Sequence, residues 1–175
     1  MRRLGVIVAI GALLSMFGGA VAAAPALAVG GRGDGWVYQD FGPGFTTDNC
    51  GFRIEATQDV DNVFAKALKA PDGSMIMLFT GAAKITFTNP ANGKSVSTNV
   101  SGAAKITVSP DGSTTTFKQM GPGPIDLTPE DAARLGLPPL FVFAGNGTAT
   151  IDTAGNITSA SLNGHILVNV CAALS

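Results

Sequence analysis

The chain has 175 residues, of which 46% are hydrophobic and only 13% are charged, and its formal net charge is −1. A nucleic-acid-binding domain needs a clustered basic surface, whereas the Lys and Arg residues are scattered along this chain, so we exclude that class. The length suits one domain with its own hydrophobic core.

The N-terminus has the three parts of a secretory signal peptide. Arg2 and Arg3 supply positive charge, Leu4–Ala23 is an apolar stretch rich in small residues, and an Ala-x-Ala sequence ends at Ala28. We therefore predict that residues 1–28 are a signal peptide and that the protein is secreted, to the outside of the cell or to its envelope. The alternative, an uncleaved membrane anchor, needs a flank rich in Lys and Arg, which is absent here. Removing 28 residues leaves 147, with nine basic and twelve acidic residues, a net charge of −3 and no predicted membrane span.

Residues 29–49 form a segment rich in glycine and aromatic residues, and residues 50–175 are predicted to form a single β domain. The chain contains two cysteines, Cys50 and Cys171, near the two ends of that domain. In an oxidising compartment such a pair is expected to form a disulfide. We predict that the bond Cys50–Cys171 holds the first and last strands of the domain side by side.

An internal repeat indicates the type of strand. The six residues Gly81–Thr86 recur as Gly102–Thr107. In each copy apolar and polar residues alternate after the alanines, which is the pattern of a half-buried antiparallel strand. Asn92-Gly93 and Asp111-Gly112 follow the copies and supply the positive φ angles that tight hairpins require.

Turn residues recur at intervals typical of an antiparallel meander. Strands are predicted at 51–58, 62–69, 74–80, 83–89, 94–101, 103–109, 113–120, 140–145, 147–153, 157–162 and 164–171. About ten short strands favour an all-β, closed or nearly closed β-barrel, because closure removes exposed sheet edges. A two-sheet β-sandwich is the alternative.

One short helix interrupts the predicted strands. Thr128 opens a capping box with Pro129 at the first helical position and Asp131 at the third, and Gly136 is a stop signal. Residues 128–135 are too few for a helical domain, so this helix is expected at a corner between parts of the sheet.

Two predicted strands are apolar on both faces, at 74–79 and 140–143. A strand of this kind is normally covered on both sides. The cover is expected to come from the aromatic segment between Trp36 and Phe45, or from a second subunit.

Four parts of the sequence carry a resemblance. They are Cys50-Gly-Phe52, Asn89-Pro-Ala-Asn-Gly-Lys-Ser95, Asn99-Val-Ser-Gly102 and Val170-Cys-Ala-Ala-Leu174. Together they resemble small secreted actinobacterial proteins of uncharacterised function. The resemblance implies export from a bacterium and a small β domain, and it supplies no catalytic residue.

The residues give little support for catalysis. His165 is the only histidine, and strand alternation turns it away from the face of Ile166 and Val168. There is no Gly-x-Ser-x-Gly nucleophile elbow, and both cysteines are assigned to the disulfide. The two glutamates have ordinary explanations, because Glu55 alternates with Arg53 on a polar face and Glu130 lies in the capping turn.

Metal and cofactor binding are also weakly supported. Asp59 and Asp61 offer hard oxygen ligands, but the rest of a calcium loop is missing, and one histidine with paired cysteines excludes a zinc site. We therefore assign no catalytic residue, no metal site and no cofactor.

What remains is a binding function, because small barrels often hold one apolar ligand. The candidate lining residues, which could equally fill a solid core, are Phe52, Phe64, Phe79, Phe87, Phe117, Phe141 and Phe143. The leading prediction is a secreted, non-catalytic protein that binds a small apolar ligand as a monomer or weak dimer. The alternatives are a structural or protein-interaction module of the cell envelope, and a barrel enzyme of unknown reaction.

Overall fold

A computed structural model describes residues 34–175. The predicted signal peptide, residues 1–28, and the first part of the segment 29–49 lie outside the described residues. The described part consists mostly of antiparallel β-structure with two short helices, which confirms the all-β prediction. No helix among residues 34–175 is long and apolar enough to cross a membrane.

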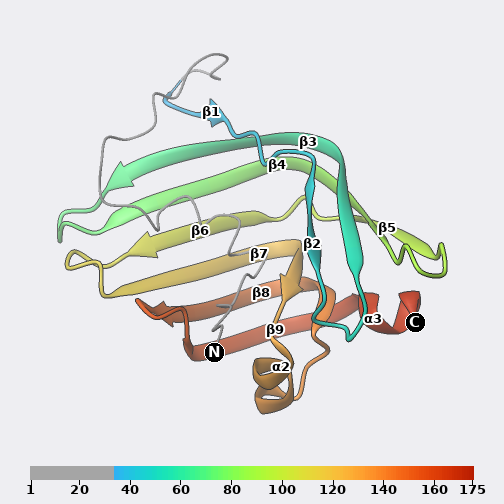
Figure 1. Cartoon of the computed structure of the whole chain (residues 1–175). Helices are drawn as coiled ribbons and strands as arrows, with labels where there is room; N and C mark the ends of the chain where they lie inside the picture. The colour runs from blue at the N-terminus through green and yellow to red at the C-terminus, as the bar shows by residue number, and fades with distance from the viewer. Residues whose placement is uncertain (1–33) are drawn as a thin grey trace.

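The described strands form one sheet (Figure 1). They are Val37–Tyr38 (β1), Gly44–Thr47 (β2), Ile54–Lys69 (β3), Met75–Thr88 (β4), Ser95–Asn99 (β5), Ala103–Val108 (β6), Thr114–Asp126 (β7), Leu140–Asp152 (β8) and Ile157–Asn169 (β9). The helices are Pro129–Leu135 (α2) and Val170–Leu174 (α3). The strand order is β1-β3-β4-β6-β7-β8-β9, with β2 paired to the start of β3 and β5 paired to the end of β4.

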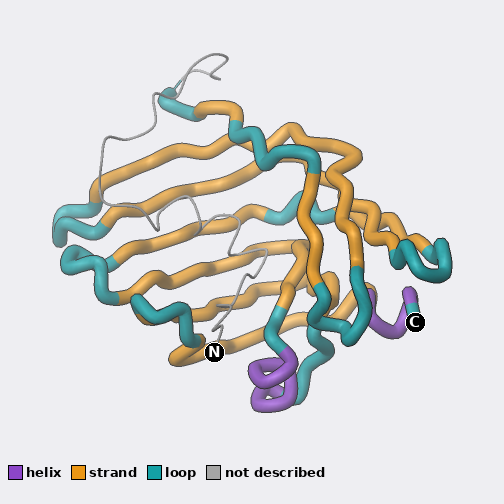
Figure 2. Tube along the Cα trace, in the orientation of Figure 1, coloured by secondary structure: helices purple, strands orange, loops and turns teal. Residues whose placement is uncertain are grey.

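The sheet is open within the described residues. There β9 pairs only with β8, while β1 and β2 pair only with β3. The closed barrel is therefore not confirmed, and the single sheet also differs from the two-sheet sandwich. The sheet instead bends along its length, as the trace in Figure 2 shows.

Four pairs of predicted short strands are single long strands. Residues 51–58 and 62–69 fall largely within β3, 74–80 and 83–89 largely within β4, 140–145 and 147–153 largely within β8, and 157–162 and 164–171 largely within β9. The predicted breaks lie at or next to a β-bulge between Gln58 and Val60 and glycines at positions 81, 145 and 164. The sequence signals for turns were real, but they mark bends within paired strands.

Gly145 and Gly164 show why the bends need glycine. They pair across β8 and β9, and a Cβ atom on Gly145 would lie 2.3 Å from the carbonyl oxygen of Asn163. A Cβ atom on Gly164 would lie 2.1 Å from the oxygen of Ala144, and both glycines have a positive φ. Gly121 of β7 is paired with Gly145 in turn, so glycines stand side by side across three strands. Such a line allows neighbouring backbones to approach closely where the sheet curves.

The core has two clusters that meet at β8. Leu140 and Val142 pack with Ile54 and Phe87 of the first cluster, whereas Phe141 and Phe143 belong to the second. Residues 140–143 are thus buried on both faces, as predicted. The second cluster includes Leu127, Ala132 and Leu135, so the α2 region provides part of the cover there.

The cover predicted for residues 74–79 is found only in part. Phe79 is buried, and its ring centroid lies 6.3 Å from that of Phe41, which comes from the expected aromatic segment. Met75, however, remains 47% exposed, and Ile76 is only half-buried. The sheet is therefore open to solvent near the start of β4.

The predicted disulfide is present. Cys50 and Cys171 are bonded, and their Cα atoms are 5.3 Å apart. The expected pairing of the first and last strands is wrong, because β3 and β9 are not neighbours in the sheet. The bond instead joins the loop before β3 to α3, a helix predicted as the end of a strand. Asn169 caps this helix, since the main-chain N–H of Ala172 donates to its Oδ1 atom at 3.1 Å.

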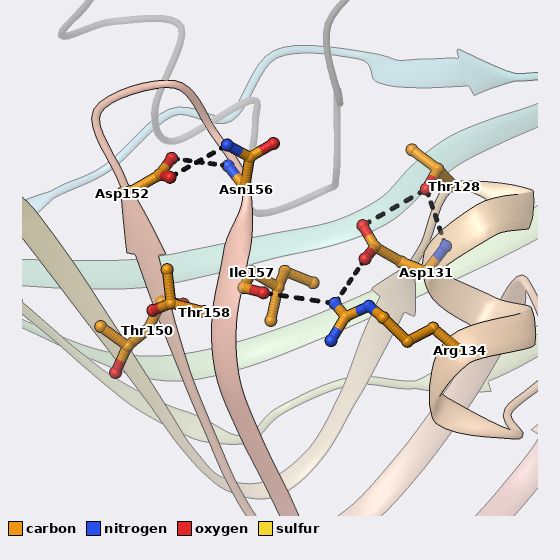
Figure 3. Close-up of polar contacts among 8 residues, drawn as sticks. All are labelled: Thr128, Asp131, Arg134, Thr150, Asp152, Asn156, Ile157 and Thr158. Carbon is orange, nitrogen blue, oxygen red and sulfur yellow. Dashed lines mark hydrogen bonds and ion pairs between the residues drawn. The ribbon is translucent and has the colours of Figure 1, made fainter.

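The predicted short helix is confirmed as α2. Thr128 caps it by accepting a hydrogen bond from the N–H of Asp131, and Gly136 ends it in the left-handed conformation. Arg134 pairs with Asp131 and also donates to the carbonyl oxygen of Ile157, which ties α2 to the start of β9 (Figure 3). The neighbouring turn is closed by side-chain contacts between Asp152 and Asn156 (Figure 3).

One part of the resemblance pattern, residues 89–95, holds the C-terminal residues, which include another part. Asn89 and Asn92 each donate a side-chain hydrogen bond to the carbonyl oxygen of Leu174, at 2.9 and 3.0 Å. Lys94 donates to the carbonyl oxygen of Ser175. These residues therefore have a structural explanation, because they fix α3 against the turn between β4 and β5.

Candidate functional site

The best-formed cavity lies on the face of the sheet that carries Phe79 and Phe117. Its volume is about 180 Å³, and it lies between the β4–β6–β7 surface and the segment that leads into β2. The larger apolar residues that line it are Phe41, Phe45, Val63, Phe79, Ile85, Val100 and Phe117.

The alternation of large and small residues explains why space is left there. Phe79 of β4 is paired with Ala104 of β6, which is paired with Gln119 of β7, which is paired with Gly147 of β8. Directly paired residues on neighbouring strands point to the same face. A small residue therefore stands next to each large one, and Gly102 and Gly123 add further room at the margin.

Phe41 and Phe45 form the opposite wall. The N–H of Phe41 donates to the Oδ2 atom of Asp61 at 3.2 Å. Phe45 is paired with Ala56 in the sheet, and its ring lies 6.3 Å from that of Phe87 in an edge-on arrangement. Contacts with β3 and β4 thus fix the positions of both phenylalanines, which line the cavity.

Gln119 is the buried polar group of this wall. The residue is 4% exposed, and its amide nitrogen donates to the carbonyl oxygens of Gly121 at 3.1 Å and Phe143 at 3.3 Å. Gln58 also lines the cavity but is only half-buried. The site therefore combines aromatic surface with one well-fixed amide.

The seven predicted phenylalanines do not gather around one cavity. Phe79 and Phe117 line it. Phe87, Phe141 and Phe143 are buried in the core, and Phe52 packs against the first core cluster. Phe64 alternates to the other face of β3, where its ring lies 6.2 Å from that of Tyr38.

Of the predicted lining residues only Phe79 and Phe117 line the cavity, and most of its wall was not predicted. Phe41 and Phe45 were expected only as a cover, and no role was predicted for Gln119. The signal for Gln119 was present in β7, where Thr115, Phe117 and Gln119 share one face by simple alternation. A glutamine that continues an apolar face is a candidate for a buried amide.

The titratable residues considered in the sequence lie away from the cavity. His165 is exposed on β9, and Glu55 forms an exposed ion pair with Arg53 at 3.1 Å. Asp59 accepts a hydrogen bond from Thr86, whereas Asp61 accepts one from the backbone of Phe41. Within residues 34–175 no three His, Cys, Asp or Glu side chains are grouped to hold a metal ion.

Asp126 is the one deeply buried carboxyl group in the described part of the chain. It is 1% exposed, and its Oδ1 atom accepts a hydrogen bond of 2.8 Å from Asn49, next to the disulfide. Its Oδ2 atom is buried without a partner. Burial raises the pKa of this carboxyl, and the hydrogen bond from Asn49 partly opposes that rise. Asp126 does not line the cavity, so we expect it to affect the stability of the fold and not ligand binding.

A second hollow, of about 270 Å³, lies at the β3–β4–β5 surface. Val60, Lys84, Ser97 and Asn99 are among its lining residues, and all four are exposed. It lacks buried side chains that would fix a ligand, and we do not assign a site there.

Comparison with known proteins adds no relative, because no protein-family model, curated protein or solved structure matches this chain.

Proposed function

We propose that the protein is exported and that it binds a small apolar ligand, without catalysis, in the cavity between Phe41, Phe45, Phe79 and Phe117. The observation that carries this proposal is the cavity itself, which aromatic residues from three separate parts of the chain surround. Ligand sites are typically concave and mostly apolar, with a few fixed polar groups. The disulfide supports the export part of the proposal, because such bonds persist in oxidising compartments.

The volume limits the size of the ligand. Drug-sized ligands occupy pockets of about 300–1,000 Å³, whereas this cavity has about 180 Å³. An engineered apolar cavity of about 150 Å³ in another protein holds benzene. The expected ligand is therefore one aromatic ring or a short alkyl chain, or the apolar end of a longer molecule.

A cavity-filling variant tests this function. Toluene is titrated into the mature protein, and binding is followed by the chemical shifts of backbone amides. Ala104→Leu should abolish binding, because residue 104 lines the cavity and the added methyl groups would occupy it. Ala160→Leu is the control, because Ala160 is exposed on β9. Binding by the wild type and the control but not by Ala104→Leu supports the proposal; no binding to the wild type overturns it.

A second candidate is the protein-interaction module, with a second copy of this chain as the partner. β9 is a thirteen-residue edge strand without a single charged Lys, Arg, Asp or Glu, and Ile166 and Leu167 are 39% and 46% exposed. Natural edge strands are usually protected by charges or by their shortness. Antiparallel pairing of β9 with β9 of a second copy, related by two-fold symmetry, would provide hydrogen-bond partners for the edge backbone N–H and C=O groups of both copies.

Sedimentation at increasing protein concentration tests this candidate. The wild type should show a monomer–dimer equilibrium, and Leu167→Lys should shift it to monomer, while Leu68→Lys on β3 should not. A wild type that stays monomeric at millimolar concentration excludes the dimer. The enzyme alternative is not proposed, because the polar residues named for it, His165 and Glu55, do not line the cavity.

A further inference from the structure

The amide of Gln119 carries information about the ligand beyond its size. Both hydrogen bonds of its side chain are made by the nitrogen, and both acceptors are backbone carbonyl oxygens. Turning the amide around would place its oxygen against those two oxygens, which repel it. The two carbonyls therefore fix the orientation of the amide.

The Oε1 atom of Gln119 is consequently left without a partner among the described residues. It is also not one of the two side-chain atoms that are sealed from solvent and unpaired, which are Oδ1 of Asp61 and Oδ2 of Asp126. Because Gln119 is 4% exposed and lines the cavity, the accessible part of its amide faces the cavity. An acceptor thus stands in a wall that is otherwise mostly aromatic and aliphatic.

The backbone around this amide is shaped to hold it. A Cβ atom on Gly123 would lie 2.8 Å from both Cδ and Nε2 of Gln119 and 3.0 Å from Oε1. Gly123 does not have the positive φ that would itself demand glycine. Its missing side chain is therefore explained by the amide that occupies the space.

We propose that the ligand carries a hydrogen-bond donor, a hydroxyl or N–H group, which the Oε1 atom of Gln119 accepts inside the apolar cavity. The ligand class is then a phenol-like or short-chain alcohol-like molecule, or the corresponding end of a larger one. This inference rests on the proposed binding function. Its physical basis is that an apolar ligand without a donor would exclude water from this carbonyl and leave it unpaired, which is unfavourable.

Phenol and toluene are suitable probes because they have nearly the same size and differ in the donor. A purely apolar cavity favours toluene, since phenol must give up its hydrogen bond to water. Affinities of both are measured by amide chemical shifts for the wild type, for Gln119→Met and for Gln39→Met. The last variant is a matched control, because Gln39 is a half-buried glutamine that does not line the cavity.

We expect the ratio of phenol affinity to toluene affinity to fall at least about tenfold in Gln119→Met and to stay unchanged in Gln39→Met. Gly123→Ala, which displaces the amide without removing it, should lower the same ratio and covers the case that Gln119→Met fails to fold. An unchanged ratio in the folded variants overturns the inference while leaving the binding function intact. Failure of both probes to bind the wild type overturns the binding function itself.

Discussion

The side chain of Asn89 donates a buried hydrogen bond of 2.9 Å to the main-chain carbonyl oxygen of Leu174, 85 positions away in the sequence. Asn92 donates to the same oxygen at 3.0 Å, but from an exposed position. The amide oxygen of each asparagine also accepts a backbone hydrogen bond two residues further on. The two residues thus make the same pair of contacts in different environments.

Asn89→Ala is expected to lower the free energy of unfolding by about 1–3 kcal/mol, because it leaves buried polar groups unsatisfied. Asn92→Ala should cost less than about 1 kcal/mol, since water can replace its contacts. Urea unfolding of both variants checks this difference. Equal effects would show that the burial of Asn89 is not what matters.

The disulfide should stabilise the fold without determining it. It closes a loop of 121 residues, and such bonds typically contribute about 2–4 kcal/mol. The double variant Cys50→Ala/Cys171→Ala should therefore unfold at lower urea concentration but keep its far-ultraviolet β spectrum. Loss of that spectrum in the absence of denaturant would mean that the sheet cannot form without the bond.

Gly145→Ala tests the close approach between β8 and β9. The new methyl group would overlap backbone atoms of Asn163 and Gly164, so we expect a loss of more than about 3 kcal/mol. Gly155→Ala is the control, because Gly155 also has a positive φ but nothing within 4 Å of its added Cβ. That variant should cost about 1–2 kcal/mol, the penalty of the left-handed conformation alone. Similar losses by thermal unfolding would rule out the steric explanation.

Asp126 should make stability depend on pH in a defined direction. The fold raises the pKa of this carboxyl by burial, so folding favours its protonated form. Its contribution is complete below the unfolded pKa of about 3.9 and is lost as the pH rises through the folded pKa. Hydrogen bonds from Ser109 and Ser113 lower the pKa of exposed Asp111 to about 2. Its contribution to the free energy of unfolding therefore has the opposite pH dependence and is lost as the pH falls toward that value.

The measurement is therefore the free energy of unfolding of the wild type minus that of Asp126→Asn at each pH. The subtraction removes the contributions of all other titrating groups, which the two proteins share. We expect the free energy of unfolding of the wild type, relative to this variant, to decrease between about pH 4 and neutral pH. A difference that is constant over this range would show that Asp126 titrates as it does in the unfolded chain.

Export predicts cleavage after Ala28. N-terminal sequencing of the protein recovered from the culture medium or envelope of its host should begin at Val29. Recovery of Met1 from that material would contradict cleavage, and recovery of the protein only from the cytosol would contradict export.

The sequence predicted features that depend on local signals. The helix α2 has its capping residue and its stop glycine, and the strands have their alternation. The bends were mistaken for turns, because a glycine with positive φ looks the same in a hairpin and in a curved strand. Only the pairing of Gly145 with Gly164 distinguishes the two, and that pairing is a long-range property.

The candidate site was less accessible from sequence. Its walls combine β4, β6 and β7 with Phe41 and Phe45, and nothing local indicates which phenylalanines will meet. Phe87 and Phe117 follow the same alternating pattern, yet one is sealed in the core and the other borders a cavity. Phe87 packs against the ring of Phe45 from a distant part of the chain, and alternation within one strand does not indicate such a contact.

The bond between Cys50 and Cys171 has a consequence for oxidative refolding. With two cysteines in the chain, only one intramolecular pairing exists, so a reduced molecule has no scrambled isomers to escape from. Refolding should need an oxidant but no disulfide isomerase. The competing product is a chain cross-linked to another chain, and its yield should rise with protein concentration.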